Sequence, residues 1–133
     1  MTVEESVVVG RPPEEVYDFV ADLERGPEWQ SSLESVDRAR GVEVRTFAGH
    51  RREASFRVTE QERPERFAIE SRTGPVRARA RFSFAPVAEG TRVDFRLEVE
   101  LGGAVRLAAA MMRGRIAREA RQNLERLSEL LEA

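Results

Sequence analysis

Few residues in this chain could carry acid–base or nucleophilic chemistry. His50 is the only histidine, Tyr17 is the only tyrosine, and neither cysteine nor lysine occurs. A lone imidazole could serve as a general base near neutral pH, whereas a metal site with more than one imidazole is excluded. The lack of lysine excludes Schiff-base chemistry, and the lack of cysteine excludes thiol nucleophiles and disulfides. We therefore expect no metal, no cofactor and no nucleophilic catalysis.

Familiar catalytic motifs are also missing. The chain has no Ser-His-Asp order, no phosphate-binding loop and no dinucleotide-binding glycine pattern, and the pair Gly102-Gly103 lacks the spacing of such loops. His50 lies in the segment AGHRRE between two predicted strands, where a solvated turn residue is the expected role. The sequence thus identifies no catalytic residue and leaves open whether the protein is an enzyme.

Arg52 is the cation whose position most favours contact with a ligand. It shares strand parity with Ala54 and Phe56, so it lies on a predicted apolar face. A buried guanidinium needs a carboxylate or a ligand anion as partner. Because Arg52 stands at a strand end, its side chain could instead extend to water.

Strands that would position these side chains are predicted by alternation of apolar and polar residues. The clearest alternation runs from Thr91 to Leu101, where every second residue is apolar and most of the others are charged. Short turns between consecutive segments favour an antiparallel sheet with one wet face. Extended segments are predicted at 3–9, 33–39, 42–47, 51–62, 67–73, 76–84 and 91–101.

Helices are predicted at two places. Pro12-Pro13 suits a first helical turn, and Val16, Phe19 and Val20 follow at helical spacing until Gly26-Pro27, which is expected to end the region. After Ala104 the apolar residues recur every three to four positions up to Leu131, which predicts a long amphipathic helix.

Composition limits the class of protein. The 133 residues suit one domain spanning 1–133, and a charged fraction of 35% with net charge −2 argues against a general nucleic-acid binder. No apolar run is long enough to span a bilayer. The first ten residues lack a basic leader, so we expect no secretory signal and a cytoplasmic protein.

The unit from Val7 to Trp29 resembles the opening of the START-like (SRPBCC) superfamily, which includes polyketide cyclases/dehydrases and lipid-transport proteins. RPERFAIESRTG, FSFAPVAEGTRV and AREARQNLERLSELLEA resemble later segments of the same pattern, so the resemblance covers nearly the whole chain. It implies the α+β helix-grip fold: a curved antiparallel sheet of about six to seven strands around a long C-terminal helix, with two short helices after the first strand. The residues that carry the opening resemblance are Pro12, Pro13, Val16, Tyr17, Ala21, Asp22, Pro27 and Trp29.

The same resemblance implies a cavity for a small molecule, because the superfamily usually builds one between sheet and helix. Phe84, Val99 and Leu101 are assigned to the core, and Trp29 is either a rim residue or a plug between helix and sheet. Thioethers suit a surface that adapts to varied ligands. The candidate ligand-binding residues are Trp29, Arg52, Phe56, Ile69, Phe82, Phe95, Met111 and Met112.

Three functions are compatible with this sequence. The first is a binding protein that holds a hydrophobic or aromatic, polyketide- or lipid-like molecule between the sheet and the C-terminal helix. The second is a polyketide aromatase/cyclase-like enzyme that uses Arg52, His50 or Tyr17 for proton transfer in the same cavity. The third is a protein that forms a homodimer through its last helix or a sheet edge and keeps only a vestigial pocket. Polar groups converging inside a cavity would favour the enzyme.

Overall fold

The chain folds as one curved sheet with helices on its concave side. The computed structural model describes residues 1–47, 49–103 and 105–133. Strand β1 (Thr2–Val9) is followed by helix α1 (Pro13–Ala21) and the 3₁₀-helix η1 (Leu23–Glu28), and helix α2 (Val105–Glu132) comes last. The strands between them are β2 (Leu33–Asp37), β3 (Val42–Phe47), β4 (His50–Glu62), β5 (Arg66–Thr73), β6 (Val76–Val87) and β7 (Gly90–Glu100).

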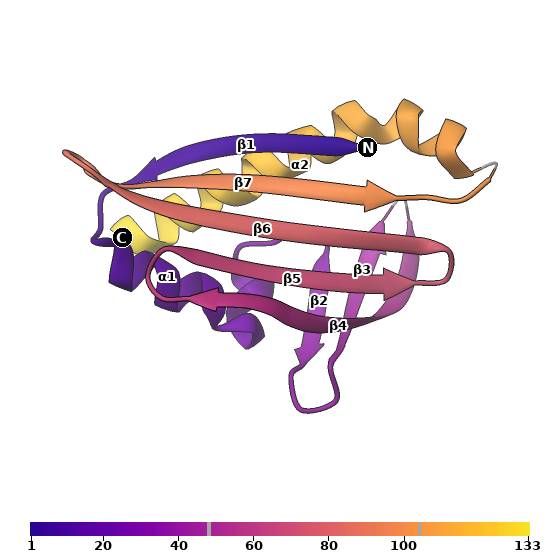
Figure 1. Cartoon of the computed structure of the whole chain (residues 1–133), viewed down its shortest axis with the longest axis horizontal. Coiled ribbons are helices and arrows are strands. Elements are labelled where there is room, and N and C mark those ends of the chain that lie inside the picture. The colour runs from indigo at the N-terminus through magenta and orange to yellow at the C-terminus, as the bar shows by residue number, and fades with distance from the viewer. Residues whose placement is uncertain (48, 104) are drawn as a thin grey trace.

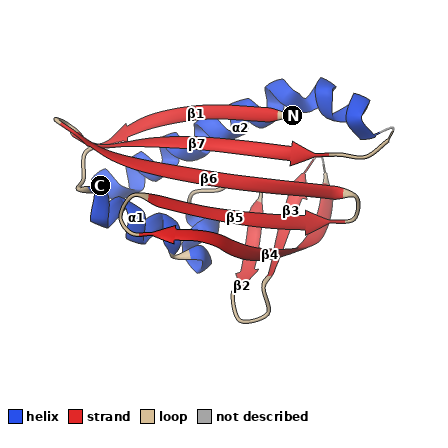
Figure 2. Ribbon diagram, viewed as in Figure 1, coloured by secondary structure: helices blue, strands red, loops and turns tan. Residues whose placement is uncertain are grey.

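All neighbouring strands pair antiparallel, in the order β1-β7-β6-β5-β4-β3-β2. In Figure 1, β2 and β3 run at a steep angle to β5, β6 and β7, so the sheet is strongly curved. Figure 2 shows α2 running diagonally along the sheet, behind its strands. These features confirm the predicted helix-grip fold, with seven strands in the described residues and two short helices after the first strand.

Helix α1 starts where the prolines predicted, but it ends earlier than expected. The Pro12 carbonyl accepts hydrogen bonds from the Glu15 and Val16 amides at 3.1 and 3.2 Å, which closes the first turn. The helix ends at Ala21, and Gly26-Pro27 lies inside η1, so the predicted stop at this dipeptide is wrong. The tighter 3₁₀ geometry accommodates it.

Gly26 sets the exit from η1 and thereby the position of Trp29. A Cβ at Gly26 would lie 2.6 Å from a Leu33 methyl carbon, so a larger residue there would force the Leu33 side chain to shift. The Gly26 carbonyl accepts from the amides of Trp29 and Gln30 at 3.1 and 2.9 Å. These bonds fix the segment that carries one wall of the candidate site.

The packed core lies toward the C-terminal half of α2. Leu124 and Leu127 are 2% and 0% exposed, and they belong to a buried cluster with residues of α1 and the sheet's centre. Phe84 is buried there, as predicted. The N-terminal half of α2 has no buried residue among those described, so the sheet and this part of the helix leave space between them.

No helix in the described ranges is long and apolar enough to cross a membrane.

Candidate functional site

A cavity of ≈ 590 Å³ lies between the concave face of the sheet and α2. This volume is in the range of small-molecule sites, which span roughly 300–1,000 Å³. Its floor is built by alternate residues of β5, β6 and β7, which the antiparallel register brings side by side: Ile69 is paired with Ala80, and Ala80 with Leu97. Its cover is the stripe of α2 that contains Val105, Met112, Ile116 and Ala120.

Aromatic rings form one part of the cavity wall. The Phe82 ring lies 5.0 Å from the Phe95 ring and 6.0 Å from the Trp29 indole, which meets it edge-on. Trp29 is only 5% exposed and yet lines the cavity, so it packs between η1 and the sheet and contributes to the wall. Its Nε1 is buried and has no hydrogen-bond acceptor among the described residues. The ring therefore acts as apolar surface.

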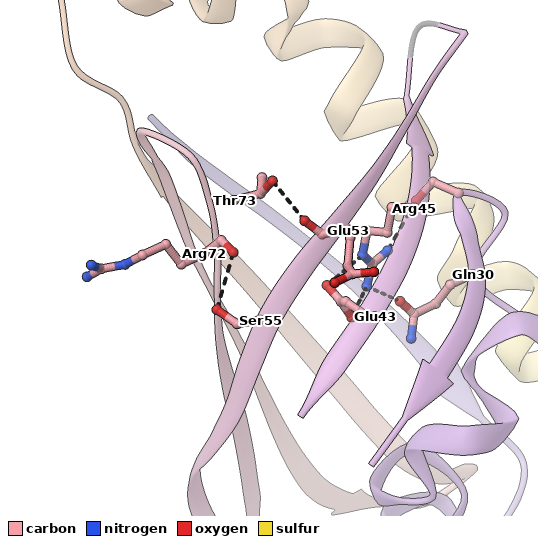
Figure 3. Close-up of polar contacts among 8 residues, drawn as sticks. Gln30, Glu43, Arg45, Glu53, Ser55, Arg72 and Thr73 are labelled. Carbon is pink, nitrogen blue, oxygen red and sulfur yellow. Dashed lines mark hydrogen bonds and ion pairs between the residues drawn. The ribbon is translucent and has the colours of Figure 1, made fainter. Parts of the chain in front are cut away.

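A polar wall interrupts this apolar lining, and it consists of Gln30, Ser32, Glu43 and Arg45. The Arg45 guanidinium donates from Nε to Glu43 Oε1 at 3.0 Å, from Nη1 to Ser32 Oγ at 3.1 Å and from Nη2 to Gln30 Oε1 at 2.9 Å. Figure 3 shows this guanidinium between Glu43 and Gln30. Glu43 is 7% exposed, and all four residues line the cavity. The polar wall is thus centred on a hydrogen-bonded ion pair that faces the cavity.

Strand register explains why the polar wall faces inward. Glu43 is paired with Ala54 and Arg45 with Arg52, and side chains of paired residues lie on the same face of a sheet. Ala54 and Arg52 line the cavity too. The charged residues of β3 therefore face the concave side of the sheet.

The loop before β2 also connects this wall to α2. The Ser31 amide donates to Asn123 Oδ1 and the Ser31 hydroxyl donates to Glu119 Oε1, both at 3.1 Å. Glu119 and Asn123 line the cavity from the helix side. Polar groups of η1–β2, β3 and α2 consequently converge on one flank of an otherwise apolar space.

The family described as "Polyketide cyclase / dehydrase and lipid transport" matches residues 1–132. The chain belongs to this family. The START-like resemblance inferred from the sequence is confirmed by that match. A search of the curated proteins found no match.

Several solved structures share this fold. The protein TTHA0849 from Thermus thermophilus has a TM-score of 0.78 at 24% identity, covering 99% of this chain and 97% of its own. The di-domain ARO/CYC protein StfQ of the steffimycin biosynthetic pathway has a TM-score of 0.76 at 13% identity, covering 98% of this chain and 50% of its own. The di-domain ARO/CYC protein BexL of the BE-7585A pathway has a TM-score of 0.72 at 20% identity, covering 100% of this chain and half of its own. At these identities the similarity concerns the fold.

In this polyketide cyclase/dehydrase family member, seven of the eight sequence-predicted ligand-binding residues line the cavity. Their contact with a ligand stays a prediction. Arg52 lies at the cavity edge, is exposed, and is the cross-strand neighbour of Arg45, whose charge Glu43 balances. His50 is exposed as well and also borders the cavity. The seven lining residues are Trp29, Arg52, Phe56, Ile69, Phe82, Phe95 and Met112.

Met111 is the eighth, and its predicted place in the cavity is wrong. Its side chain is 88% exposed, whereas Met112 lines the cavity. Successive residues of an α-helix point about 100° apart, and here Met112 turns toward the sheet while Met111 turns away from it. The assignment of Val99 and Leu101 to the core is also wrong: both are half-buried and line the cavity, because the end of β7 borders this space.

Tyr17, a proton-transfer candidate of the enzyme hypothesis, lies in the core. It is 5% exposed, meets the rings of Phe67 and Phe84 edge-on at 5.9 and 5.5 Å, and does not line the cavity. Burial raises the pKa of its hydroxyl; the Asp18 charge adds to this shift and Arg63 opposes it. The family member therefore keeps Tyr17 neutral and structural.

Sequence reasoning missed the polar wall. In VEVRTF the valines suggest the buried face, but Glu43 is buried and Val42 and Val44 are only half-buried. The available signal was the alternation of Glu43 with Arg45, which places opposite charges two residues apart on one face. Within residues 1–47, 49–103 and 105–133, no group of three or more histidine, aspartate or glutamate side chains could hold a metal ion.

Proposed function

We infer that the protein binds a hydrophobic or aromatic small molecule, polyketide- or lipid-like, in the cavity between the sheet and α2. The observation that carries this inference is a ≈ 590 Å³ space lined mainly by apolar side chains from the sheet and the helix. Apolar pockets with a few placed polar groups are the usual form of small-molecule sites. Membership of a family described by polyketide and lipid ligands supports the same class.

The lining predicts how such a ligand would lie. An apolar body would contact Phe56, Ile69, Phe82 and Met112, and a polar substituent would reach the polar wall. The Arg45 Nη1 donates one of its two hydrogens to Ser32, so the other is available to a ligand oxygen. A neutral hydroxyl or carbonyl suits this wall, because Glu43 already balances the Arg45 charge.

Binding is expected to change the emission of Trp29, the only tryptophan. We would titrate the protein with 1,8-dihydroxyanthraquinone and, separately, with palmitate, following Trp29 fluorescence and thermal unfolding. One-to-one saturation of at least one probe is expected, and probe at about 100 times its Kd should add about 2.7 kcal/mol of stability. A panel of aromatic and fatty probes that neither alters emission nor raises the melting temperature would contradict the inference.

A cyclase-like enzyme is the second candidate, and the polar wall is the observation that favours it. An ionisable pair that faces ligand space could move protons during ring closure, with Glu43 as base and Arg45 as donor to the developing oxyanion. Two solved structures of the same fold are described as ARO/CYC proteins. His50 and Arg52 are exposed at the cavity edge and could assist only at its mouth.

Glu43→Gln distinguishes binding from catalysis, because it preserves shape and removes the base. If the protein cyclises a linear aryl polyketone surrogate, this change should lower kcat about 100-fold or more, with surrogate affinity altered less than about threefold. Glu53→Gln is the matched control, since Glu53 pairs with Val44 on the outer face of β4 and is exposed. Product analysis by chromatography measures the rate. Equal rates for wild type and Glu43→Gln would exclude Glu43 as the base.

A further inference from the structure

The first turns of α2 carry an exposed apolar stripe that the cavity does not use. Leu107 is 77% exposed and Met111 is 88% exposed. They are the two most exposed of the four exposed large hydrophobic residues among those described; of the other two, Val105 lines the cavity at the start of α2 and Val8 lies on β1. Such a concentration on one short segment indicates an interaction surface.

Helical geometry places this stripe opposite the cavity. Leu107 and Met111 are four residues apart and lie on one helix face, with the exposed small residues Ala110 and Gly114 between and after them. The residues of these turns that line the cavity lie on the other side: Val105, Ala108, Ala109 and Met112. The exposed face of 107–114 is called the outer stripe below.

Arginines flank the outer stripe. Residues 105–118 contain Arg106, Arg113, Arg115 and Arg118 and no acidic residue, so this segment carries four positive charges. The whole chain carries −2, so the other residues together carry −6. At 100° per residue, Arg106 and Arg113 lie on one side of the stripe and Arg115 lies on the other, while Arg118 continues the line of Leu107 and Met111 about two turns further along the helix.

The start of α2 is free to approach a flat surface. Figure 1 shows its first turns extending past the beginning of β1 in this view. Arg113 Nη2 donates to the Thr2 carbonyl at 3.1 Å and so ties the helix to β1 beyond the second turn. The outer stripe begins before this contact, on the segment that projects.

We propose that the outer stripe of α2 docks on an anionic lipid surface, with Leu107 and Met111 inserted among the lipids and the flanking arginines at the headgroups. Apolar side chains bordered by cations are the pattern of helices that lie in a membrane interface, and long cationic side chains keep their charge at the headgroup level. The proposal goes beyond the inferred function, because docking by the ligand-free protein requires no occupant in the cavity.

Other occupants fit the outer stripe less well. A second copy would bring four positive charges against four positive charges. A protein partner normally offers pockets for aromatic or well-packed anchors, whereas residues 105–118 contain no aromatic side chain, and three alanines separate Leu107 from Met111. A lipid surface needs no complementary pocket.

Vesicle flotation of the purified, ligand-free chain tests the proposal. Vesicles of phosphatidylcholine alone are compared with vesicles containing about 30% phosphatidylglycerol, at about 0.1 M NaCl, where surface charges still act over about 10 Å. We expect partition at least tenfold stronger onto the anionic vesicles, falling as NaCl is raised. Equal partition onto both vesicle types would overturn the proposal.

Two double variants separate insertion from attraction. Leu107→Ser/Met111→Ser should weaken partition at least about tenfold. Arg106→Gln/Arg118→Gln should weaken it about 25-fold, since each surface arginine contributes about fivefold. Arg113 is left unchanged because its guanidinium donates a hydrogen bond to the Thr2 carbonyl. Circular dichroism and thermal unfolding verify that both variants fold.

Matched controls use residues far from the stripe. Val8→Ser removes an exposed large hydrophobic residue outside α2, and Arg40→Gln/Arg72→Gln removes the same charge from exposed positions in a turn and on β5. Both should bind anionic vesicles as wild type does; equal losses in controls and test variants would overturn the proposal. Retention on immobilised polyglutamate without vesicle binding would assign the arginines to an acidic protein and would also overturn it.

Discussion

Replacing Gly90 by alanine is expected to destabilise the fold by about 3–5 kcal/mol, the largest effect of a single methyl group in this chain. Gly90 opens β7 with a φ of 141°, a conformation that side chains rarely adopt. An added Cβ would lie 2.2 Å from the Val9 carbonyl oxygen and 2.8 Å from the Arg11 amide nitrogen. Both are backbone atoms, so neither can rotate away.

The neighbouring Thr91 ties the start of β7 to the segment between β1 and α1. Thr91 is 0% exposed, and its hydroxyl donates to the Arg11 carbonyl at 2.7 Å, which joins the start of β7 to the segment between β1 and α1. Displacing β7 there would disturb the pairing of β1 and the entry into α1. Loss of stability should therefore extend over the sheet.

Two glycine controls isolate the cause. At Gly74 the φ is 56° with nothing within 4 Å of an added Cβ, and at Gly102 the space is also empty. Gly74→Ala should cost about 1 kcal/mol from strain alone, and Gly102→Ala should change stability by less than about 0.5 kcal/mol. Urea unfolding followed by circular dichroism measures all three. A Gly90→Ala variant as stable as Gly102→Ala would show that β7 can leave Val9 and Arg11 without loss.

Local patterns predicted the helices and strands of this fold, but which face of each element is buried was harder to predict. Alternation located β4 to β7 within a few residues, because one face of each strand is buried and the other is wet. In β3 the sequence predicted an extended segment without a buried face: Glu43 is the buried residue, because Arg45 donates to it and is itself held by Ser32 and Gln30. The alternation of Glu43 with Arg45 indicates that the two charges share a face, but the partners Gln30 and Ser32, which come from another segment, cannot be inferred from a six-residue strand.

Some residues of the candidate site could likewise be predicted from the sequence, and others could not. Phe56, Ile69, Phe82 and Phe95 could be assigned to the concave face from parity alone, and they line the cavity. Helical spacing places Met112, and not Met111, on the apolar stripe of the last helix, and Met111 was included only because thioethers suit an adaptable surface. The outer stripe was missed because the sequence predicts its residues only as part of a long amphipathic helix, and its exposed side was not yet known.

Ala80→Trp is expected to weaken binding of 1,8-dihydroxyanthraquinone about 100-fold or more, a loss of about 2.8 kcal/mol. Ala80 lies mid-strand on β6 between Ile69 and Leu97, and all three line the cavity floor. An indole there would occupy space that the ligand needs. Because the indole fills an existing cavity, the melting temperature should stay within a few degrees of wild type.

Ala85→Trp is the matched control on the same strand. Ala85 is exposed and pairs with Arg92. It lies on the outer face, because it follows Ala80 by five positions and successive residues of a strand point to opposite faces. Equilibrium dialysis suits this comparison, since each variant adds a second tryptophan to the Trp29 signal. Unchanged binding in Ala85→Trp with loss in Ala80→Trp places the ligand in the cavity. Wild-type affinity in both variants would mean that the probe binds elsewhere, and the inferred function would lose its site.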